Sequence, residues 1–284
     1  MSNLKPDSVI ACLDCPNHVQ AVLDASMWAA RRLQSPIGLL YAVPTLQQKA
    51  AVNYSGCLTI DEENAMLDQF THLEHLNNCA LKAQGKLLLN QATAYCEQQN
   101  DKRKTYTLHR HENLSESIDY VDDKSQLIVI GHQVTCKSTL SQLIRLSQCP
   151  ILVTCAPFSP PKTALFAFDN CATSHKLLNW LCKSPLARTL TVHIVMIAKN
   201  NSANCDALRD AYARLKQSGI DTKKALLDSR DVSATLSYYQ REHDIGLLMT
   251  GAFGQSRLRE LFQGSDTEKL LGSTKTPYLL FPKA

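Results

Sequence analysis

The sequence lacks the features that would hold a chain in a membrane or leave it unfolded. No run in its 284 residues approaches the roughly 20 apolar residues of a membrane-spanning helix, so we expect no membrane span. Residues 1–6 lack the basic and apolar regions of a secretory signal, which favours a cytoplasmic protein. Glycine and proline are scarce, at 10 and 11 residues, beside 44% hydrophobic residues. This composition excludes a disordered or collagen-like chain.

The chain also has little net charge and no cluster of charges of one sign. The formal net charge is +4, and no run of five or six like charges occurs. We therefore expect neither a nucleic-acid partner nor a polybasic membrane patch. The 11 cysteines are odd in number and irregularly spaced. This pattern indicates free thiols in a reducing compartment and not a disulfide framework.

The first half of the chain opens with a strand, helix and strand pattern. Apolar runs at 9–13 and 37–43 flank a helical pattern at 19–33. Such a unit, joined by short loops, predicts a mainly parallel, buried sheet with right-handed crossovers. One long helix or two consecutive helices are predicted for residues 61–100. Further strands are predicted at 104–109, 127–130 and 151–153.

A proline-rich segment follows, and then the same order of elements returns. Three prolines at positions 157, 160 and 161 predict a stiff linker. After it, strands are predicted at 165–168, 190–197, 222–227, 246–250 and 278–281. We therefore expect an internal duplication with two α/β domains, 1–157 and 162–284. Each is expected to hold a five-stranded, mainly parallel sheet with helices on both faces.

The most informative segment follows the fourth predicted strand of the second half. Gly251 ends that strand, and Gly254 comes three residues later, so backbone N–H groups can approach an anion without an intervening side chain. After nine more residues, Gly264 precedes Ser265, which begins a capping-box pattern at the start of a predicted helix. Glycine turns together with a helix N-terminus predict a phosphate-binding loop.

In this segment the chain resembles the universal stress protein family, as a tandem member. The family's nucleotide signature, G-x2-G-x9-G-[ST], is matched by Gly251, Gly254, Gly264 and Ser265. The resemblance covers essentially the whole chain in two copies. It implies Rossmann-like domains of the adenine-nucleotide alpha hydrolase type, with strand order 3-2-1-4-5 and close pairing along the last strands. Protein partners and a homodimer stay open.

The resemblance also implies which residues contact a nucleotide. The family's first strand ends in an Asp that contacts the nucleoside, which corresponds to Asp169 and, in the first half, to Asp14. Its second strand meets the adenine through the backbone of a residue pair, here Ile194 and Val195, with Tyr41 and Ala42 as the first-half counterparts. The implied nucleotide site comprises Asp169, Val195, Gly251, Gly254, Gly264, Ser265, Asp266 and Thr267.

The two halves depart from the family pattern differently. In the first half only Gly131 remains, because Val134 replaces the second glycine and the Gly-Ser pair is missing. That half is expected to be a pseudo-site, or to bind a ligand other than a triphosphate. In the second half, Cys171 replaces a small hydroxyl residue. Asp266 places a carboxylate in the phosphate-facing turn, where it could repel phosphate, complete the cap or help to hold a divalent ion.

The expected function is a stress-response protein whose second half binds ATP or a related adenine nucleotide with Mg²⁺ or Mn²⁺. No catalytic residue can be identified, and no base is present to orient an attacking water, so the nucleotide is expected to be a regulatory ligand. Slow hydrolysis stays open. The protein ligands of the metal are not indicated.

Two other classes of function compete with nucleotide binding. One is a scaffold or small-molecule-binding stress protein with a decayed nucleotide site. The other is a thiol oxidoreductase that uses Cys12 and Cys15, although the strand pattern predicts a buried Cys12. The remaining histidine groups, His72 and His75 with Glu74, and His109 with His111, lack metal-ligand spacing and are expected to be solvated.

Overall fold

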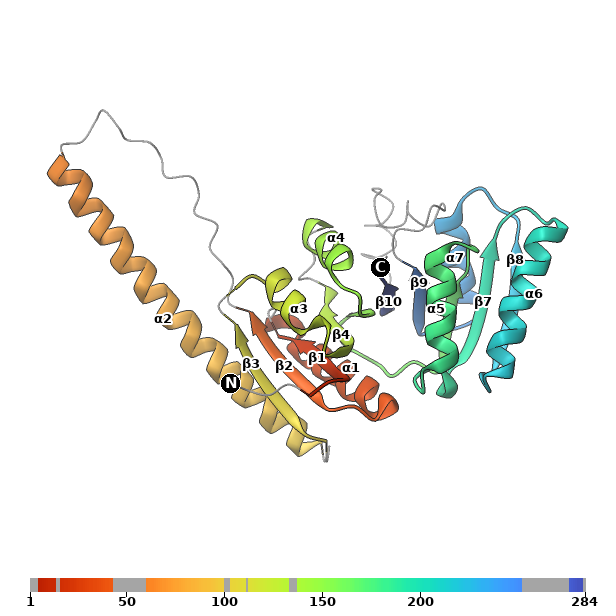
Figure 1. Ribbon diagram of the computed structural model, residues 1–284, viewed down its shortest axis with the longest axis horizontal. Helices are drawn as coiled ribbons and strands as arrows, with labels where there is room; N and C mark the ends of the chain where they lie inside the picture. The colour runs from red at the N-terminus through yellow and green to blue at the C-terminus, as the bar shows by residue number, and fades with distance from the viewer. Residues whose placement is uncertain are drawn as a thin grey trace.

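The chain forms a mixed α/β fold around one long sheet (Figure 1). The computed structural model describes residues 5–13, 16–42, 60–99, 103–110, 112–132, 137–251 and 276–282. Within them the sheet has ten strands. Helices cover both of its faces (Figure 1), as the sequence predicted.

The first half supplies five strands and the long helical insertion. Its strands are β1 (Ser8–Cys12), β2 (Ile37–Ala42), β3 (Thr105–Arg110), β4 (Ser125–Gly131) and β5 (Ile151–Thr154). Its helices are η1 (Pro16–His18), α1 (Val19–Leu33), α2 (Ile60–Gln98), α3 (Leu114–Asp122) and α4 (Lys137–Leu146).

The second half repeats this order, with a shorter helix in the place of α2. Its strands are β6 (Thr163–Ala167), β7 (Thr191–Ile197), β8 (Thr222–Leu227), β9 (Leu247–Gly251) and β10 (Tyr278–Phe281). Its helices are α5 (Ala172–Lys183), η3 (Ala187–Thr189), α6 (Ser202–Gln217) and α7 (Val232–Glu242). The strands predicted from the sequence are all present, whereas the helix predicted at 267–271 lies outside the described residues.

The sheet order shows the duplication directly. The strands run β3-β2-β1-β4-β5-β10-β9-β6-β7-β8, so each half has the expected order 3-2-1-4-5. Neighbouring strands within each half are parallel, and β5 and β10 pair antiparallel where the halves meet. In this pair Leu279 lies opposite Leu152, and Leu280 opposite Ile151. Each last strand thereby covers an edge that would otherwise expose unpaired backbone groups.

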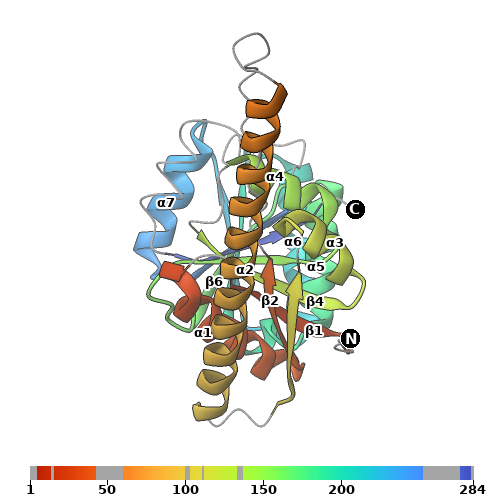
Figure 2. The ribbon, with the colours of Figure 1, turned by 90° about the vertical axis from the view of Figure 1, so that its left-hand side faces the viewer.

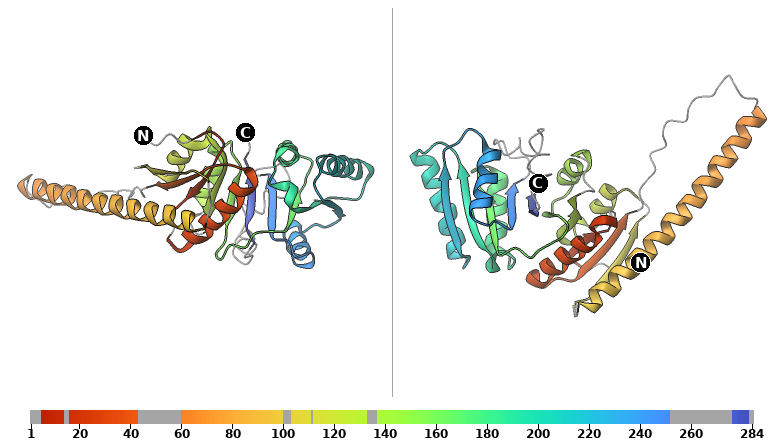
Figure 3. Two further views of the ribbon diagram at one scale, coloured as in Figure 1. Left: turned by 90° about the horizontal axis from the view of Figure 1, so that it is seen from below. Right: turned by 180° about the vertical axis from the view of Figure 1, so that it is seen from behind.

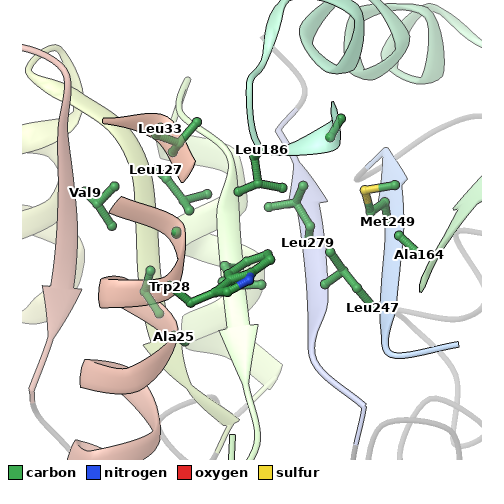
Figure 4. Packing of buried hydrophobic residues seen from close by; sticks show 14 of the residues in the cluster. Val9, Ala25, Trp28, Leu33, Leu127, Ala164, Leu186, Leu247, Met249 and Leu279 are labelled. Carbon is green, nitrogen blue, oxygen red and sulfur yellow. The ribbon is translucent and has the colours of Figure 1, made fainter. Parts of the chain in front are cut away.

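Hydrophobic side chains alternate between the two faces of the sheet, as the two-residue repeat of a strand requires. Leu279 belongs to a core beneath α1, α2, α5 and α6, where Trp28 of α1 and Leu186 lie close to it (Figure 4). Leu280 belongs to a second core beneath α3, α4 and α7. Both cores contain residues from both halves, so the halves share their hydrophobic interior.

The insertion folds as one 39-residue helix, α2, and not as two. Its C-terminal part lies against α1, where Gln20 donates a hydrogen bond to the Tyr95 hydroxyl and Tyr95 donates to Asp24 (2.7 and 2.8 Å). Figure 2 shows α2 crossing the side of the first half, and Figure 3 shows its N-terminal part extending beyond the sheet. The helix therefore has a docked end and a projecting end.

Gly85 allows α2 to approach β2 and β3 closely. A Cβ atom at Gly85 would lie 2.4 Å from Tyr41 Cδ1 and 2.8 Å from His109 Nε2. His109 is half-buried and meets Tyr41 edge-on, with ring centroids 5.5 Å apart. The prediction of a solvated His109 is therefore wrong. His72 is exposed, as expected. His111 and the side chains of Glu74 and His75 lie outside what the structure describes.

Candidate functional site

A cavity of about 690 Å³ opens at the carboxyl ends of β6 and β7 and beside the loop that follows β8. Its volume falls in the range of small-molecule sites, and ligands of open α/β sheets bind at this edge. The apolar wall includes Val195 and Ile197 of β7 and Val232 and Leu236 of α7. The polar lining consists of Asp169, Lys199, Asn201, Asn204, Asp228, Ser229 and Arg230.

The loop between β8 and α7 is held by its own hydrogen bonds. Asp231 caps α7, because its carboxylate accepts the Ala234 N–H at 2.9 Å. The Thr235 hydroxyl donates to Ser229 Oγ at 2.8 Å. These contacts fix the start of α7, which forms one wall of the cavity.

Asp169 lines the cavity and shapes the loop after β6. Its Oδ1 accepts the Cys171 N–H at 3.1 Å. The cap of α5 is Cys171, whose sulfur accepts the Ser174 N–H at 3.4 Å. Burial raises the pKa of the Cys171 thiol, and the hydrogen bond with Asp169 raises it further, which favours the neutral thiol. Cys171 is thus the N-cap of α5, and Asp169 lines the cavity.

Val195 lies in the wall of the cavity, as its predicted role requires. The side chain is buried at 1% exposure. Its carbonyl accepts the Phe168 N–H at 2.9 Å, which ties the end of β6 to β7. Ile194 belongs to the other core, beneath α5 and α6, and does not line the cavity.

The first-half counterpart of Val195 is Leu40. The Leu40 carbonyl accepts the Leu13 N–H at 2.8 Å, which is the same bond at the same place in the sheet. The counterpart of Ile194 is then Leu39, so the predicted counterparts, Tyr41 and Ala42, are each wrong by two residues. A sequence alignment by hydrophobic pattern cannot detect so small a shift inside two continuous apolar strands.

Gly251 ends β9 on the other side of β6 from the cavity, next to the pair formed by Thr250 and Ala167. A Cβ at Gly251 would lie 2.9 Å from Thr173 Cγ2, at the start of α5. Gly131 takes the equivalent place, where a Cβ would lie 2.7 Å from His18 Cβ. Packing against the helical segment that follows the first strand of each half thus explains why both halves have this glycine. The phosphate-binding prediction depends on the rest of the loop.

That rest of the loop lies outside the described residues. It contains five of the predicted nucleotide-binding residues: Gly254, Gly264, Ser265, Asp266 and Thr267. Asp14, Cys15 and Val134 of the first half lie outside as well. Of the predicted site, the structure thus places Asp169 and Val195 at one cavity and Gly251 two strands from Val195.

Sequence reasoning missed six polar residues of the cavity. Lys199, Asn201 and Asn204 follow β7, and Asp228, Ser229 and Arg230 follow β8. A signal was available, because polar residues just after neighbouring parallel strands gather at one edge of the sheet. The glycine signature does not include these positions.

The corresponding edge of the first half has a different chemistry. Arg110 ends β3, forms an ion pair with Glu112 and lies over the Tyr120 ring at 4.1 Å. Its counterpart by strand register is Leu227 at the end of β8. The half without the complete glycine signature therefore also differs from the second half at this edge of the sheet.

The thiol and metal alternatives find little support in the described residues. Cys12 is 1% exposed within β1, which leaves its sulfur inaccessible to a substrate. None of the described cysteines forms a disulfide. The described residues contain no group of three or more His, Cys, Asp or Glu side chains able to hold a metal ion. No described helix is both long and apolar enough to cross a membrane.

Known proteins resemble this chain along nearly its whole length. No protein-family model matches it. A curated universal stress protein from Synechocystis sp. is 29% identical over 289 residues, covering 96% of this chain and 99% of the relative. The structure of a universal stress protein from Archaeoglobus fulgidus DSM 4304 matches with a TM-score of 0.64 at 11% identity, covering 99% of this chain and 98% of that one.

A functionally unknown protein from Pseudomonas aeruginosa PAO1 has a similar structure. It matches with a TM-score of 0.60 at 14% identity and covers 98% of this chain and 92% of its own. Both solved structures therefore share the fold across both halves. The Rossmann-like, duplicated architecture expected from the sequence is confirmed.

Proposed function

Because the chain belongs to the universal stress protein family as a tandem member, we propose that its second half binds ATP or a related adenine nucleotide. The main support for this proposal is the position of the cavity. It lies at the carboxyl ends of β6 and β7, with Asp169 in its lining, while Gly251 ends β9 on the far side of β6. Adjacent strands lie about 4.8 Å apart, so Gly251 and β7 are separated by roughly 10 Å across the sheet.

The cavity supports distinct roles for its residues. The purine lies against the apolar wall formed by Val195 of β7 and by Val232 and Leu236 of α7. Asp169 accepts hydrogen bonds from the ribose hydroxyls, because its carboxylate lines the cavity and each carboxylate oxygen can accept more than one hydrogen bond. The base and sugar are thus bound by the described residues.

The phosphates extend from the sugar toward Gly251. In this proposal the loop residues Gly254, Gly264, Ser265, Asp266 and Thr267 surround them, through backbone N–H groups and the positive end of a helix. Mg²⁺ or Mn²⁺ supplies charge neutralisation when bound. Since Asp169 and Asp228 are the only carboxylates in the described lining of the cavity, the ion is held chiefly by phosphate oxygens, with Asp266 as a further ligand.

We propose that the nucleotide regulates the protein and is not rapidly turned over. The part of the cavity lining that the structure describes contains no histidine to act as a base for an attacking water. The domains 1–157 and 162–284 then differ in role. The first acts as a structural half or binds another ligand, and the second binds nucleotide in the cytoplasm.

A second candidate is a small-molecule or scaffold function without a nucleotide. It is favoured by the mixed charge of the cavity rim, where Lys199 and Arg230 lie near Asp228, because adenine carries no charge that needs these groups. This candidate predicts a ligand at the same cavity that does not depend on the glycine loop.

The variant Gly254→Val separates the two candidates. A β-branched side chain would block the backbone approach to phosphate, so ATP affinity should fall at least tenfold. Calorimetric titration with Mg·ATP at pH 7.5 measures this change, and thermal melting checks the fold. The matched control is Val134→Ala, at the same position in the first half, which should leave affinity unchanged. Absence of ATP binding to wild type at millimolar concentration, or equal affinity of the Gly254→Val variant, contradicts the proposal.

A further inference from the structure

Helix α7 connects the cavity to a cluster of titratable rings. Val232, Leu236, Tyr239 and His243 follow one another at steps of four, three and four, which places them on one face of the helix. Val232 and Leu236 line the cavity, and Tyr239 and His243 lie at the other end of the helix. A movement of the C-terminal end of α7 therefore also moves the wall of the cavity.

The sheet presents a matching row from β7. His193, Val195 and Ile197 alternate along the strand on the same face. Val195 and Ile197 share a hydrophobic core with Val232, Leu236 and Tyr239. The same row thus begins in the cavity, at Ile197 and Val195, and ends at His193.

His193, Tyr239 and His243 form a compact group, which we call the ring cluster. A hydrogen bond of 3.2 Å joins His193 Nδ1 to the Tyr239 hydroxyl. Ring centroids lie 5.2 Å apart between His193 and His243, and 4.1 Å apart between Tyr239 and His243. His193 is 2% exposed, whereas His243 is exposed. One histidine of the cluster is thus buried beneath the helix.

Charged groups on β8 also face this cluster. Lys223 lies opposite His193 in the sheet register. Asp221, just before β8, accepts hydrogen bonds from Thr191 and Lys216, and these contacts lower its pKa so that it stays ionised. On the other side of β7, His193 is paired with the apolar Leu165. His193 therefore has one acidic and two basic neighbours among these groups.

These surroundings favour a neutral His193. Burial lowers its pKa below the ordinary value, the charges of Lys223 and His243 lower it further, and Asp221 partly opposes them. A histidine released from this position regains its ordinary pKa near 6.5 and binds a proton more readily. As pH falls from 6.5 toward the lower pKa of the folded state, stability of the docked helix is lost, by at most about tenfold in equilibrium constant per pH unit.

We propose that the ring cluster is a pH-sensitive contact that holds α7 against β7, and that acidification releases α7 and opens the wall of the cavity. The release itself requires no ligand. Its consequence, weaker nucleotide binding at low pH, rests on the proposed function. The protein would then respond to cytoplasmic acidification through its second half alone.

The first half provides an internal comparison. By strand register the counterpart of His193 is Gly38, and by helix capping the counterpart of Tyr239 is Val121. Helix α3 presents Leu114, Ile118 and Val121 to the same kind of core. It should therefore stay docked when the pH falls.

Hydrogen–deuterium exchange of the full-length, nucleotide-free protein at pH 7.5 and 5.5 tests the release. After correction for the chemical exchange rate, opening of residues 232–242 should increase by up to about tenfold at pH 5.5, while residues 114–122 stay unchanged. In His193→Leu this selective increase should disappear. The control His72→Gln, at an exposed histidine of α2, should keep it.

The outcomes separate the two proposals. Equal changes in 232–242 and 114–122, or an undiminished increase in His193→Leu, contradict the pH-sensitive contact. If His193→Leu does not fold, His243→Gln serves instead, because loss of the neighbouring charge should reduce the increase. Titration with Mg·ATP at both pH values then measures whether release of α7 weakens nucleotide binding, and we expect weaker binding at pH 5.5. Release of α7 without any ATP binding contradicts the nucleotide proposal and leaves the contact supported.

Discussion

Replacing Leu280 with aspartate is expected to unfold the protein under conditions in which the wild type is folded. Leu280 is fully buried in β10, opposite Ile151 of β5, where the two halves of the sheet join. Loss of a buried leucine side chain costs about 2–5 kcal/mol, and burial of a carboxylate adds several more. The total is comparable with the roughly 5–15 kcal/mol by which a native protein is stable.

Urea denaturation measures this effect, read by circular dichroism. The control is Leu87→Asp, at a leucine of α2 that is 59% exposed. Its free energy of unfolding should change little, by about 0.5 kcal/mol or less. A Leu280→Asp variant as stable as wild type would contradict the antiparallel junction of β5 and β10. Partial unfolding of only one half would show that the shared cores contribute less than the structure indicates.

Replacing Asp169 with asparagine is expected to weaken ATP binding by about 10- to 100-fold while leaving the fold intact. Asparagine keeps a carbonyl oxygen that can accept the Cys171 N–H, so the loop after β6 is retained. It loses the charge and one acceptor, and a hydrogen bond to a charged group contributes about 1.5–3 kcal/mol. The affinity should therefore change without a change in melting temperature.

The first half again offers the matched control. Asp14→Asn alters the corresponding residue at the end of β1 and should leave ATP affinity unchanged. Calorimetric titration with Mg·ATP at pH 7.5 distinguishes the two variants. Equal loss in both would place nucleotide in both halves, and no loss in Asp169→Asn would remove Asp169 from the ribose site.

The strands could be predicted because they depend on features that are local in the sequence, whereas their order was implied by the family resemblance. A run such as Leu127 to Ile130 is buried on both faces, and only a central parallel strand gives a short run of that kind. The turn and linker residues then limit the connections to a few topologies. The pairing of β5 with β10 was also implied by the resemblance, and it agrees with the need to cover two exposed strand edges.

Contacts between distant segments were not predictable in the same way. The sequence left open whether residues 61–100 form one helix or two. Helix α2 is continuous through Gly85, where the missing side chain makes room for Tyr41 and His109. The same contact buries part of His109, which the sequence pattern placed in solvent. A glycine has two opposite interpretations, as a breaker or as a point of close approach, and only tertiary packing decides between them.

The candidate site was predictable in part. Asp169 and Val195 were implied by the family resemblance, and both line the cavity. Gly251 was correctly placed at the end of β9, but its packing against Thr173 shows that this glycine alone does not indicate phosphate binding. Lys199 and Arg230 were missed because they stand outside the glycine signature, although their positions soon after β7 and β8 place them at this edge of the sheet.

The central claim is that one half of this duplicated protein binds an adenine nucleotide and the other does not. The most direct test is the stoichiometry of Mg·ATP binding to the full-length, ligand-free protein at pH 7.5, measured by calorimetry. We expect one ATP per chain, with binding weakened in Asp169→Asn and kept in Asp14→Asn. Two ATP per chain, or none at millimolar concentration, would contradict it.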